Sequence, residues 1–243
     1  MQAYIGGVGT LRNSRDNSED SIVIFFAGCN FRCPYCYNSS ILGFSEEFLI
    51  DTRDVKLKIE EILKSDNRIS SVILTGGEPL LQRQAMLSIA RFCRMKGLKI
   101  VLETNGSKPN SLKSLLAEGL ADSVIMDLKS PPEEGIFERT TRSSTFFKSP
   151  GEIIRDITYS IELLRSQEDE VQIEFKTLMA EGLTSSLSHL LKIAEWIGNT
   201  NATWTISPVE KQDFSAVLEQ FRRIIPALEQ RFPQLKVRIE NPI

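Results

Sequence analysis

Histidine and cysteine are scarce in this 243-residue chain: His189 is the only histidine, and there are four cysteines. A structural zinc centre needs four nitrogen or sulfur ligands, and the one histidine lies far from most of the cysteines in the sequence. We expect His189 to lie on the polar side of a helix whose other side carries Leu190 and Ala194. It would then be an exposed surface residue without a specific role. A zinc site is therefore disfavoured.

Long apolar runs and an excess of either charge are also absent. The net charge is −3, so composition does not point to nucleic acid. The longest apolar run, from Ile22 to Gly28, is far too short to span a bilayer. The N-terminus lacks the charged and then apolar segments of a signal peptide. We therefore expect a cytoplasmic protein with reduced cysteines that binds neither nucleic acid nor a membrane.

Three of the four cysteines lie within eight residues: Cys29, Cys33 and Cys36 follow the spacing C-x-x-x-C-x-x-C. Three thiolates can hold three irons of an iron–sulfur cube and leave the fourth iron open to a substrate or cofactor. Cys33-Pro34-Tyr35-Cys36 could instead be a thioredoxin-like redox pair, but Cys29 would then be unexplained. A disulfide framework would need an oxidising compartment. The spacing favours a catalytic cluster, and Cys93 is expected to be a buried core residue.

Strand and helix patterns alternate along the chain. Apolar, β-branched runs predict strands, and apolar residues at helical spacing predict helices between them. The predicted strands cover residues 21–27, 71–75, 99–104, 123–127, 171–178, 203–207 and, as a short last strand, 236–240. Asp51 is expected to cap the first helix and Asn110 the third. Residues 131–149 are expected to be irregular and polar.

Six strand–helix units in tandem predict an α/β fold with a parallel sheet, in one domain spanning residues 1–243. An open doubly wound sheet and a partial barrel fit this alternation equally well. Unusual motifs follow each of the first four strands, and a barrel brings those strand ends to a single mouth. We therefore favour a partial (β/α)6 TIM-like barrel.

Three of these motifs could bind a ligand. Gly76-Gly77-Glu78-Pro79 ends the second strand, where glycines let the backbone approach a ligand. Glu103-Thr104-Asn105-Gly106 ends the third strand with side chains that could reach hydroxyl groups or an ammonium. Asp127 and Lys129 end the fourth strand on one face, where an opposite-charge pair could hold a zwitterion. Each motif could also be an ordinary turn or a surface ion pair, so the signal lies in their joint occurrence after the cysteine loop.

The cysteine motif, with aromatic Tyr35 before its last cysteine, resembles the signature of the radical S-adenosylmethionine (SAM) enzymes. Gly76-Gly77-Glu78-Pro79 resembles the glycine-rich motif of that family. Residues 26–38, together with Glu103–Gly106 and Asp127–Lys129, are similar to the activating enzymes of glycyl-radical proteins. That subgroup includes the activating proteins of anaerobic ribonucleoside-triphosphate reductase and of pyruvate formate-lyase. The resemblance covers nearly the whole chain and implies a radical SAM core with a partial six-stranded barrel.

The resemblance implies one 4Fe–4S cluster on Cys29, Cys33 and Cys36, with SAM bound at the open iron. One electron from a flavodoxin- or ferredoxin-type reductant would cleave SAM and give a 5′-deoxyadenosyl radical. That radical would take a hydrogen atom from a glycine of a partner glycyl-radical enzyme, for which anaerobic ribonucleotide reductase is the expected candidate. No protein nucleophile or general base is needed, so no catalytic side chain is predicted.

The resemblance also implies which residues contact SAM. The glycine loop would lie at the methionine amino group, Lys129 with Asp127 at the carboxylate, and Tyr35 near the adenine. Two further side chains would lie by the ribose or methionine portion, and a lysine of the fifth strand would add a polar contact. The full set is Tyr35, Gly76, Gly77, Glu78, Glu103, Asn105, Asp127, Lys129 and Lys176.

Two other functions remain open. One is a radical SAM enzyme with a small-molecule substrate, such as 7-carboxy-7-deazaguanine synthase, although that family typically continues from its last cysteine into Asp-Thr and this chain has Tyr37-Asn38. The other is an iron–sulfur electron carrier, in which Asp127, Lys129 and the glycine loop would have no purpose. Few residues remain for an enclosed small-molecule pocket, and with only Cys93 left a second cubane cannot be built. We therefore expect a macromolecular substrate.

Overall fold

The computed structural model describes residues 1–12, 20–210 and 212–240. The chain forms two compact units. The first comprises Met1–Asn30, Tyr37–Thr104 and Asn110–Val124, and the second comprises Phe31–Cys36, Asn105–Pro109 and Ile125–Ile243. The expected single domain over residues 1–243 stays a prediction.

In the ranges that the structure describes, the strands of the first unit follow the order β3-β1-β2-β4-β5. Their bounds are β1 (Gln2–Leu11), β2 (Asp20–Phe26), β3 (Leu49–Asp51), β4 (Ile69–Gly76) and β5 (Lys99–Thr104). β2, β4 and β5 run parallel, with Ile22 opposite Val72 and Val72 opposite Ile100. All three of these side chains are fully buried, as expected of a parallel sheet covered on both faces. β1 pairs antiparallel with both β2 and β3.

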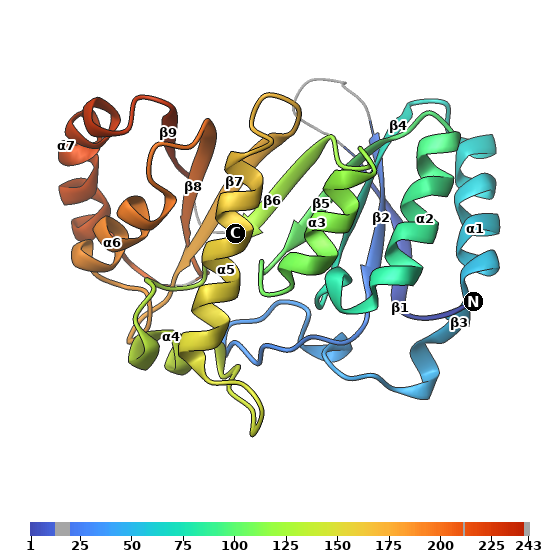
Figure 1. The fold of residues 1–243 in the computed structure, drawn as a ribbon, viewed down its shortest axis with the longest axis horizontal. Coiled ribbons are helices and arrows are strands. Elements are labelled where there is room, and N and C mark those ends of the chain that lie inside the picture. Colours follow the sequence, from blue (N-terminus) through green and yellow to red (C-terminus); the bar gives the residue numbers. More distant parts are fainter. Residues whose placement is uncertain (13–19, 211, 241–243) are drawn as a thin grey trace. The chain divides into compact units, whose positions relative to one another are not determined.

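The helices of this unit carry the apolar faces that the sequence predicted. Figure 1 shows α1 (Thr52–Ser65) and α2 (Arg83–Met95) side by side. Asp51 caps α1 by accepting a hydrogen bond from the backbone N–H of Arg53 at 2.8 Å, which confirms its predicted role. Cys93 is a buried free thiol on α2, also as predicted. The prediction for Asn110 was wrong, because α3 (Pro109–Ala117) begins one residue earlier, at a proline suited to the first turn of a helix.

The second unit contains most of β6 (Ser123–Asp127), followed by β7 (Gln172–Met179), β8 (Ala202–Pro208) and β9 (Leu235–Ile239), in that order across the sheet. β7, β8 and β9 pair in parallel. The core includes Trp204 and Phe221, whose rings meet edge to face at 5.6 Å. The buried indole N–H of Trp204 donates to the hydroxyl of Thr177 at 3.0 Å, so this polar group has a hydrogen-bond partner despite its burial.

Among the described residues, the helices of the second unit are α4 (Glu134–Thr141), α5 (Pro150–Arg165), α6 (Leu187–Ile197) and α7 (Ser215–Arg231). α6 and α7 lie side by side in Figure 1. The expectation of an irregular stretch over residues 131–149 was wrong in part, because α4 occupies its middle. No helix in the described ranges is both long and apolar enough to cross a membrane.

Candidate functional site

The glycine loop of the first unit packs directly on the start of the cysteine motif. The N–H of Gly77 donates to the carbonyl of Phe26 at 2.8 Å, and the N–H of Glu78 donates to that of Gly28 at 2.9 Å. A β-carbon on Gly77 would overlap the carbonyl oxygen of Gly28 and press on the β-carbon of Cys29 at 3.2 Å. Gly76 has a φ of +119°, where side chains are strained. Glycine is therefore required here so that the loop can fit against Cys29.

Asn38 also fixes this loop, although the sequence analysis did not single it out as a site residue. Its side-chain N–H donates to the carbonyl of Gly76 at 2.9 Å. Two backbone bonds join the same region, from Gly28 N to Ile41 O at 2.8 Å and from Cys29 N to Leu42 O at 3.1 Å. The backbone of Cys29 is thus held on one side by residues 38–42 and on the other by residues 76–78.

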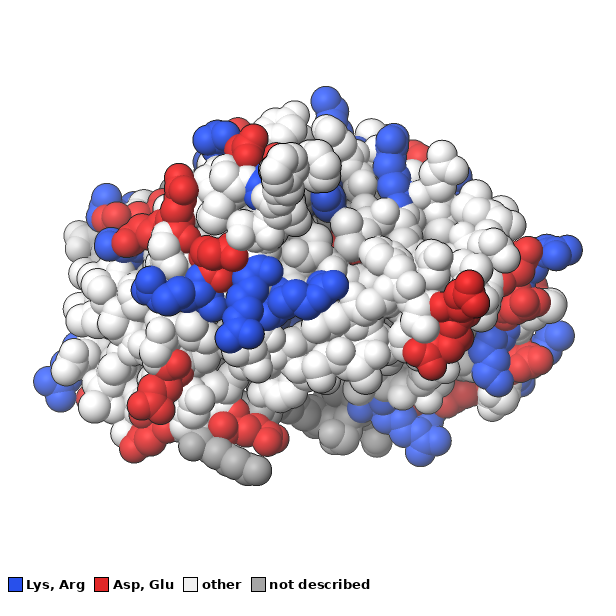
Figure 2. Space-filling view, turned by 90° about the horizontal axis from the view of Figure 1, so that it is seen from below, with Lys and Arg blue, Asp and Glu red and all other residues white. Residues whose placement is uncertain are grey.

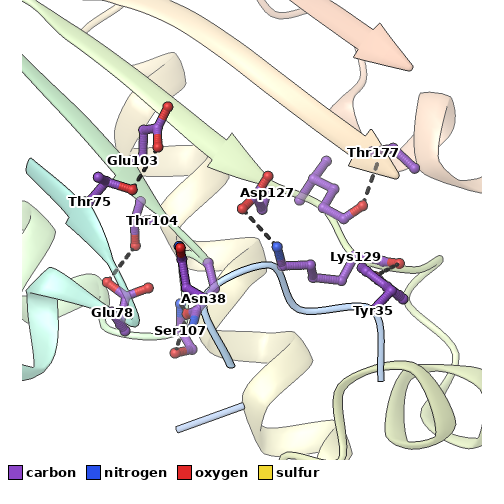
Figure 3. Close-up of polar contacts among 12 residues, drawn as sticks. Tyr35, Asn38, Thr75, Glu78, Glu103, Thr104, Ser107, Asp127, Lys129 and Thr177 are labelled. Carbon is purple, nitrogen blue, oxygen red and sulfur yellow. Dashed lines mark hydrogen bonds and ion pairs between the residues drawn. The ribbon is translucent and has the colours of Figure 1, made fainter. Parts of the chain in front are cut away.

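Glu78 is fully buried and organises the turn after the glycines. Its Oε1 accepts from the N–H of Leu80 at 3.0 Å and from the hydroxyl of Thr104 at 2.8 Å, and it caps the short 3₁₀ helix Pro79–Gln82. The hydroxyl of Thr75, near the end of β4, donates to Oε2 of Glu103 on the neighbouring strand β5 at 2.6 Å. Figure 3 shows both contacts. The two carboxylates are held in defined positions, and their roles toward SAM stay predictions.

Lys129 and Asp127 form an ion pair at the end of β6 in the second unit, with 2.7 Å between Nζ and Oδ2 (Figure 3). The backbone of this segment is tied to β7 and the turn after it. The hydroxyl of Thr177 donates to the carbonyl of Leu128 at 3.0 Å, and that of Thr184 to the carbonyl of Lys129 at 2.8 Å. The backbone carbonyl of Lys176 accepts a hydrogen bond from the N–H of Leu128 at 2.8 Å. The pair predicted from alternation along the strand is therefore present.

The Lys129 ammonium remains charged despite its half-buried position. Burial alone would lower the pKa of Lys129, but the Asp127 carboxylate, with Cys33 and Tyr35 nearby, outweighs it, so the net pKa is raised. Burial raises the pKa of the Tyr35 phenol, and its hydroxyl lies 3.5 Å from the Lys129 carbonyl. Burial also raises the pKa of the Cys33 thiol, while the Lys129 cation opposes that rise. Lys129, Tyr35 and Cys33 are thus electrostatically coupled in one unit.

The cysteine thiols fit an iron–sulfur cluster by the chemistry of the donor set. Cys29, Cys33 and Cys36 are partly exposed and form no disulfide, and soft thiolates are the donors that such clusters use. Cys29 belongs to the first unit and the other two to the second. Among the described residues, no group of three or more His, Cys, Asp or Glu side chains is arranged so that it could hold a metal ion. The assignment of all three cysteines to one cluster stays a prediction.

Helix α4 supports the segment that carries Cys33 and Cys36. The N–H of Arg32 donates to the carbonyl of Thr141, the last residue of α4, at 2.7 Å. The rings of Phe31 and Phe137 meet edge to face with centroids 5.9 Å apart. Sequence reasoning missed this supporting element. The sequence gives one indication of this helix, because Ile136 and Phe137 precede Thr140 and Thr141 by four residues, the spacing of one helix face. All four are buried.

Asn105 and Gly106 form a turn. An ordinary turn was the alternative interpretation of the motif Glu103-Thr104-Asn105-Gly106. Asn105 is buried, and its side-chain oxygen accepts from the N–H of Ser107 at 3.0 Å and from its hydroxyl at 2.6 Å. Gly106 has a φ of +73°, and a β-carbon there would lie 2.7 Å from the sulfur of Met126. The contact of Asn105 with a cofactor stays a prediction.

His189 is half-buried, so the expectation of an exposed surface residue without a specific role was wrong. Its Nδ1 accepts from the N–H of Ser185 at 3.3 Å. Burial lowers the pKa of this imidazole. The backbone N–H groups of the turn before α6 are therefore satisfied in part by this ring, which gives His189 a structural role.

Comparison with protein-family models finds a match to the Radical SAM superfamily over residues 23–166, more than half of the chain. A Methanocaldococcus jannaschii protein named as a glycyl-radical enzyme activating enzyme is 32% identical over 131 residues, covering 53% of this chain and 51% of the relative. The pyruvate formate-lyase-activating enzyme of Clostridium pasteurianum is 25% identical, covering 73% and 69%. The 7-carboxy-7-deazaguanine synthase of Clostridium acetobutylicum is 32% identical, covering 61% and 64%.

Solved structures share the fold. A radical SAM methyltransferase from Sphaerobacter thermophilus superposes with a TM-score of 0.63 at 12% identity, covering 98% of this chain and 77% of that one. QueE from Escherichia coli superposes with a TM-score of 0.57 at 12% identity, covering 98% and 94%. These likenesses confirm the predicted α/β fold class with a partial-barrel core. The chain spans only about half the length of the M. jannaschii relative.

Proposed function

Because this chain belongs to the radical SAM superfamily, we propose that it activates a glycyl-radical enzyme by taking a hydrogen atom from a glycine of that partner. Members of the superfamily use a 4Fe–4S cluster and SAM, which when bound supply a 5′-deoxyadenosyl radical by one-electron cleavage of SAM. The proposed partner is an anaerobic ribonucleoside-triphosphate reductase, and the proposed reductant is a flavodoxin- or ferredoxin-type protein. The names of the M. jannaschii and C. pasteurianum relatives support activation of a glycyl-radical enzyme as the reaction.

Cys29, Cys33 and Cys36 would hold the cluster. The observation that carries this assignment is the set of three partly exposed cysteines, none of them in a disulfide, at C-x-x-x-C-x-x-C spacing. The packing of Gly77 against Gly28 fixes the backbone that bears Cys29. In the other unit, burial raises the pKa of the Cys33 thiol, and the cation of Lys129 opposes that rise and so favours the thiolate that a metal ligand needs.

The chain's own residues would bind and orient SAM. Lys129 would donate to the carboxylate of the methionine portion, with Asp127 keeping the ammonium in position. The loop of Gly76, Gly77 and Glu78 would present backbone groups to the amino group. The remaining proposed contacts are Tyr35 at the adenine, Glu103 and Asn105 at the ribose or methionine portion, and Lys176 as a further polar contact.

A second candidate function has support of its own. The 7-carboxy-7-deazaguanine synthase of C. acetobutylicum matches a share of this chain similar to that matched by the activating enzymes, at 32% identity. We rank this function second because Tyr37-Asn38 follows the last cysteine, where that family typically has Asp-Thr.

The rate of 5′-deoxyadenosine formation separates the two functions. The reduced, reconstituted enzyme is incubated with SAM alone, with the purified reductase, and with a pool of small metabolites. The glycyl-radical function predicts slow formation with SAM alone and acceleration by the reductase. Acceleration by the metabolite pool, with no effect of the reductase, would support the small-molecule function instead.

A further inference from the structure

Phe146 and Phe147 lie almost completely in solvent. Their exposed fractions are 96% and 89%, the largest among the large hydrophobic residues in the described ranges. The two rings pack edge to face on each other, with centroids 5.2 Å apart and planes at 87°. Adjacent exposed aromatic rings of this kind are unfavourable in water and mark interaction sites more often than single exposed side chains do.

The loop that carries these rings (residues 143–149) is anchored at its C-terminal end. Thr145 and Lys148 exchange backbone hydrogen bonds of 3.0 and 3.3 Å and close a tight turn around the two phenylalanines. Ser149 and Glu152 form a reciprocal capping box at the start of α5. The ammonium of Lys148 forms an ion pair with Asp156 on the same helix.

The N-terminal end of the loop is anchored by one carboxylate. Glu138 accepts hydrogen bonds from Ser144 N at 3.0 Å, Ser144 Oγ at 2.7 Å and Ser143 N at 3.3 Å. Arg142, which directly follows the last residue of α4, has a φ of +45°, a conformation that side-chain-bearing residues rarely adopt. Such strain persists where surrounding contacts maintain it. The phenylalanines are therefore presented on an organised turn, which lowers the entropic cost of binding through them.

The loop is linked to the cysteine segment through α4. It begins two residues after Thr141, whose carbonyl accepts from Arg32 N, and α4 also contacts that segment through Phe137 and Phe31. In Figure 1 the loop projects beyond α4 and the start of α5. A protein bound at the loop would therefore lie next to the segment that bears Cys33 and Cys36.

The base of the loop carries exposed charges of both signs. Arg139 on α4 and Arg142 just after that helix are exposed, and so are Glu133 and Glu134 at its start. Figure 2 shows groups of Lys and Arg and groups of Asp and Glu side chains on the face seen from below. The two arginines lie nearest to the loop in the sequence and can pair with acidic side chains around an apolar pocket of a partner.

We propose that the loop of residues 143–149 is the docking element for the partner protein that carries the target glycine. Phe146 and Phe147 would enter an apolar pocket of that protein, and Arg139 and Arg142 would meet an acidic rim. This inference rests on the proposed function. A substrate protein fits the loop better than an electron donor does, because electron-transfer encounters have small, transient interfaces, whereas paired aromatic anchors are typical of the energetic centres of stable ones.

The test compares Phe146→Ser/Phe147→Ser with the wild type and with Met95→Ser, which changes another strongly exposed hydrophobic residue, on α2. Glycyl-radical formation is measured against the concentration of the purified reductase, and 5′-deoxyadenosine formation is measured without it. We expect the double variant to raise the KM for the reductase by about 30-fold, the loss typical of interface hot spots. Its partner-independent rate, its kcat and all values of Met95→Ser should stay at the wild-type level.

An unchanged KM in the double variant, with normal radical formation by the wild type, would overturn the docking role and leave the proposed function standing. No radical and no binding with the wild type would overturn both. Wild-type binding to phosphatidylglycerol vesicles that the double variant loses would assign the loop to a membrane surface instead. Wild-type dimerisation that the double variant loses would assign it to a second copy of this chain.

Discussion

Lys129 Nζ lies 2.7 Å from Oδ2 of Asp127, two residues earlier on the same strand end. The pair is only partly shielded, with 19% of the lysine side chain and 34% of the aspartate side chain exposed. Asp127 and the neighbouring Tyr35 and Cys33 keep the pKa of the ammonium raised although burial opposes it. A cation held in this way can attract a carboxylate without leaving its first partner, since an ammonium has three N–H donors.

Replacement of Lys129 by Ala should weaken SAM binding. Loss of a charge-assisted hydrogen bond to the SAM carboxylate is expected to cost roughly 1.5–3 kcal/mol, which is about a 10- to 150-fold rise in Kd. Equilibrium dialysis with labelled SAM measures this change in the reconstituted protein. Lys113→Ala, an exposed position on α3, serves as the control and should bind SAM normally. Equal affinities for the two variants would show that Lys129 does not contact SAM.

Replacement of Gly77 by Ala should disturb the cysteine motif. The added β-carbon meets the backbone carbonyl of Gly28 and the β-carbon of Cys29, neither of which can rotate away. We expect lower iron content after anaerobic reconstitution and a lower Tm. Gly43→Ala is the matched control, because Gly43 lies in the same loop region with open space around its α-carbon and no positive φ. Full iron loading of Gly77→Ala would contradict the packing described for this loop.

Replacement of Thr104 by Val should destabilise the first unit. It removes the hydroxyl that donates to the buried Glu78 carboxylate at 2.8 Å, and hydrogen bonds to charged groups contribute about 1.5–3 kcal/mol. Urea unfolding of the metal-free, reduced protein measures the loss. Thr203→Val, at a half-buried position of β8, should change the free energy of unfolding by less than about 0.5 kcal/mol. A Thr104→Val protein as stable as the control would mean that Glu78 needs no such donor.

The buried thiol of Cys93 should make stability fall in alkaline solution. Burial raises the pKa of this thiol from its ordinary value of 9.0 to about 12. Below pH 9 the thiol is protonated in both states and has no effect. As the pH rises through 9 the unfolded chain loses the proton and the native protein keeps it, so by pH 10 stability falls by roughly 1 kcal/mol.

Cys93→Ala should therefore lose less stability than the wild type between pH 8 and pH 10, as measured by urea unfolding of the reduced, metal-free protein. The same variant should retain about four irons after reconstitution, the content of one cubane. Cys33→Ala should lose them. Iron loss in Cys93→Ala with retention in Cys33→Ala would contradict the ligand assignment.

The sequence was sufficient to predict most of the sheet. Runs such as residues 21–27 are apolar on both faces, and a parallel strand covered by helices has that pattern. β1 was missed because its core-facing residues are interrupted by Gly6, Gly7 and Gly9, and glycine is unfavourable in strands. α4 was missed because eight residues flanked by proline and serine give a weak periodic signal.

The positions of the candidate site residues were predictable, but many of their partners were not. Local alternation is enough to place Asp127 and Lys129 on one face. No local pattern indicates that Asn38 binds the carbonyl of Gly76, or that Thr104 binds Glu78 across 26 positions of sequence. Likewise, nothing in the sequence around Phe146 indicates that Glu138 holds the preceding serines. Contacts of this kind depend on how the chain folds back on itself.

Electron paramagnetic resonance of the partner protein tests the central claim most directly. The reduced, reconstituted enzyme is mixed anaerobically with SAM and the purified anaerobic ribonucleoside-triphosphate reductase of the same organism, and the spectrum is recorded after turnover. We predict a glycyl-radical signal that requires SAM, the reductant and the three cysteines, and that disappears when the target glycine of the reductase is replaced by alanine. The absence of any radical on the reductase, together with rapid formation of 5′-deoxyadenosine from a small metabolite alone, would contradict the proposal.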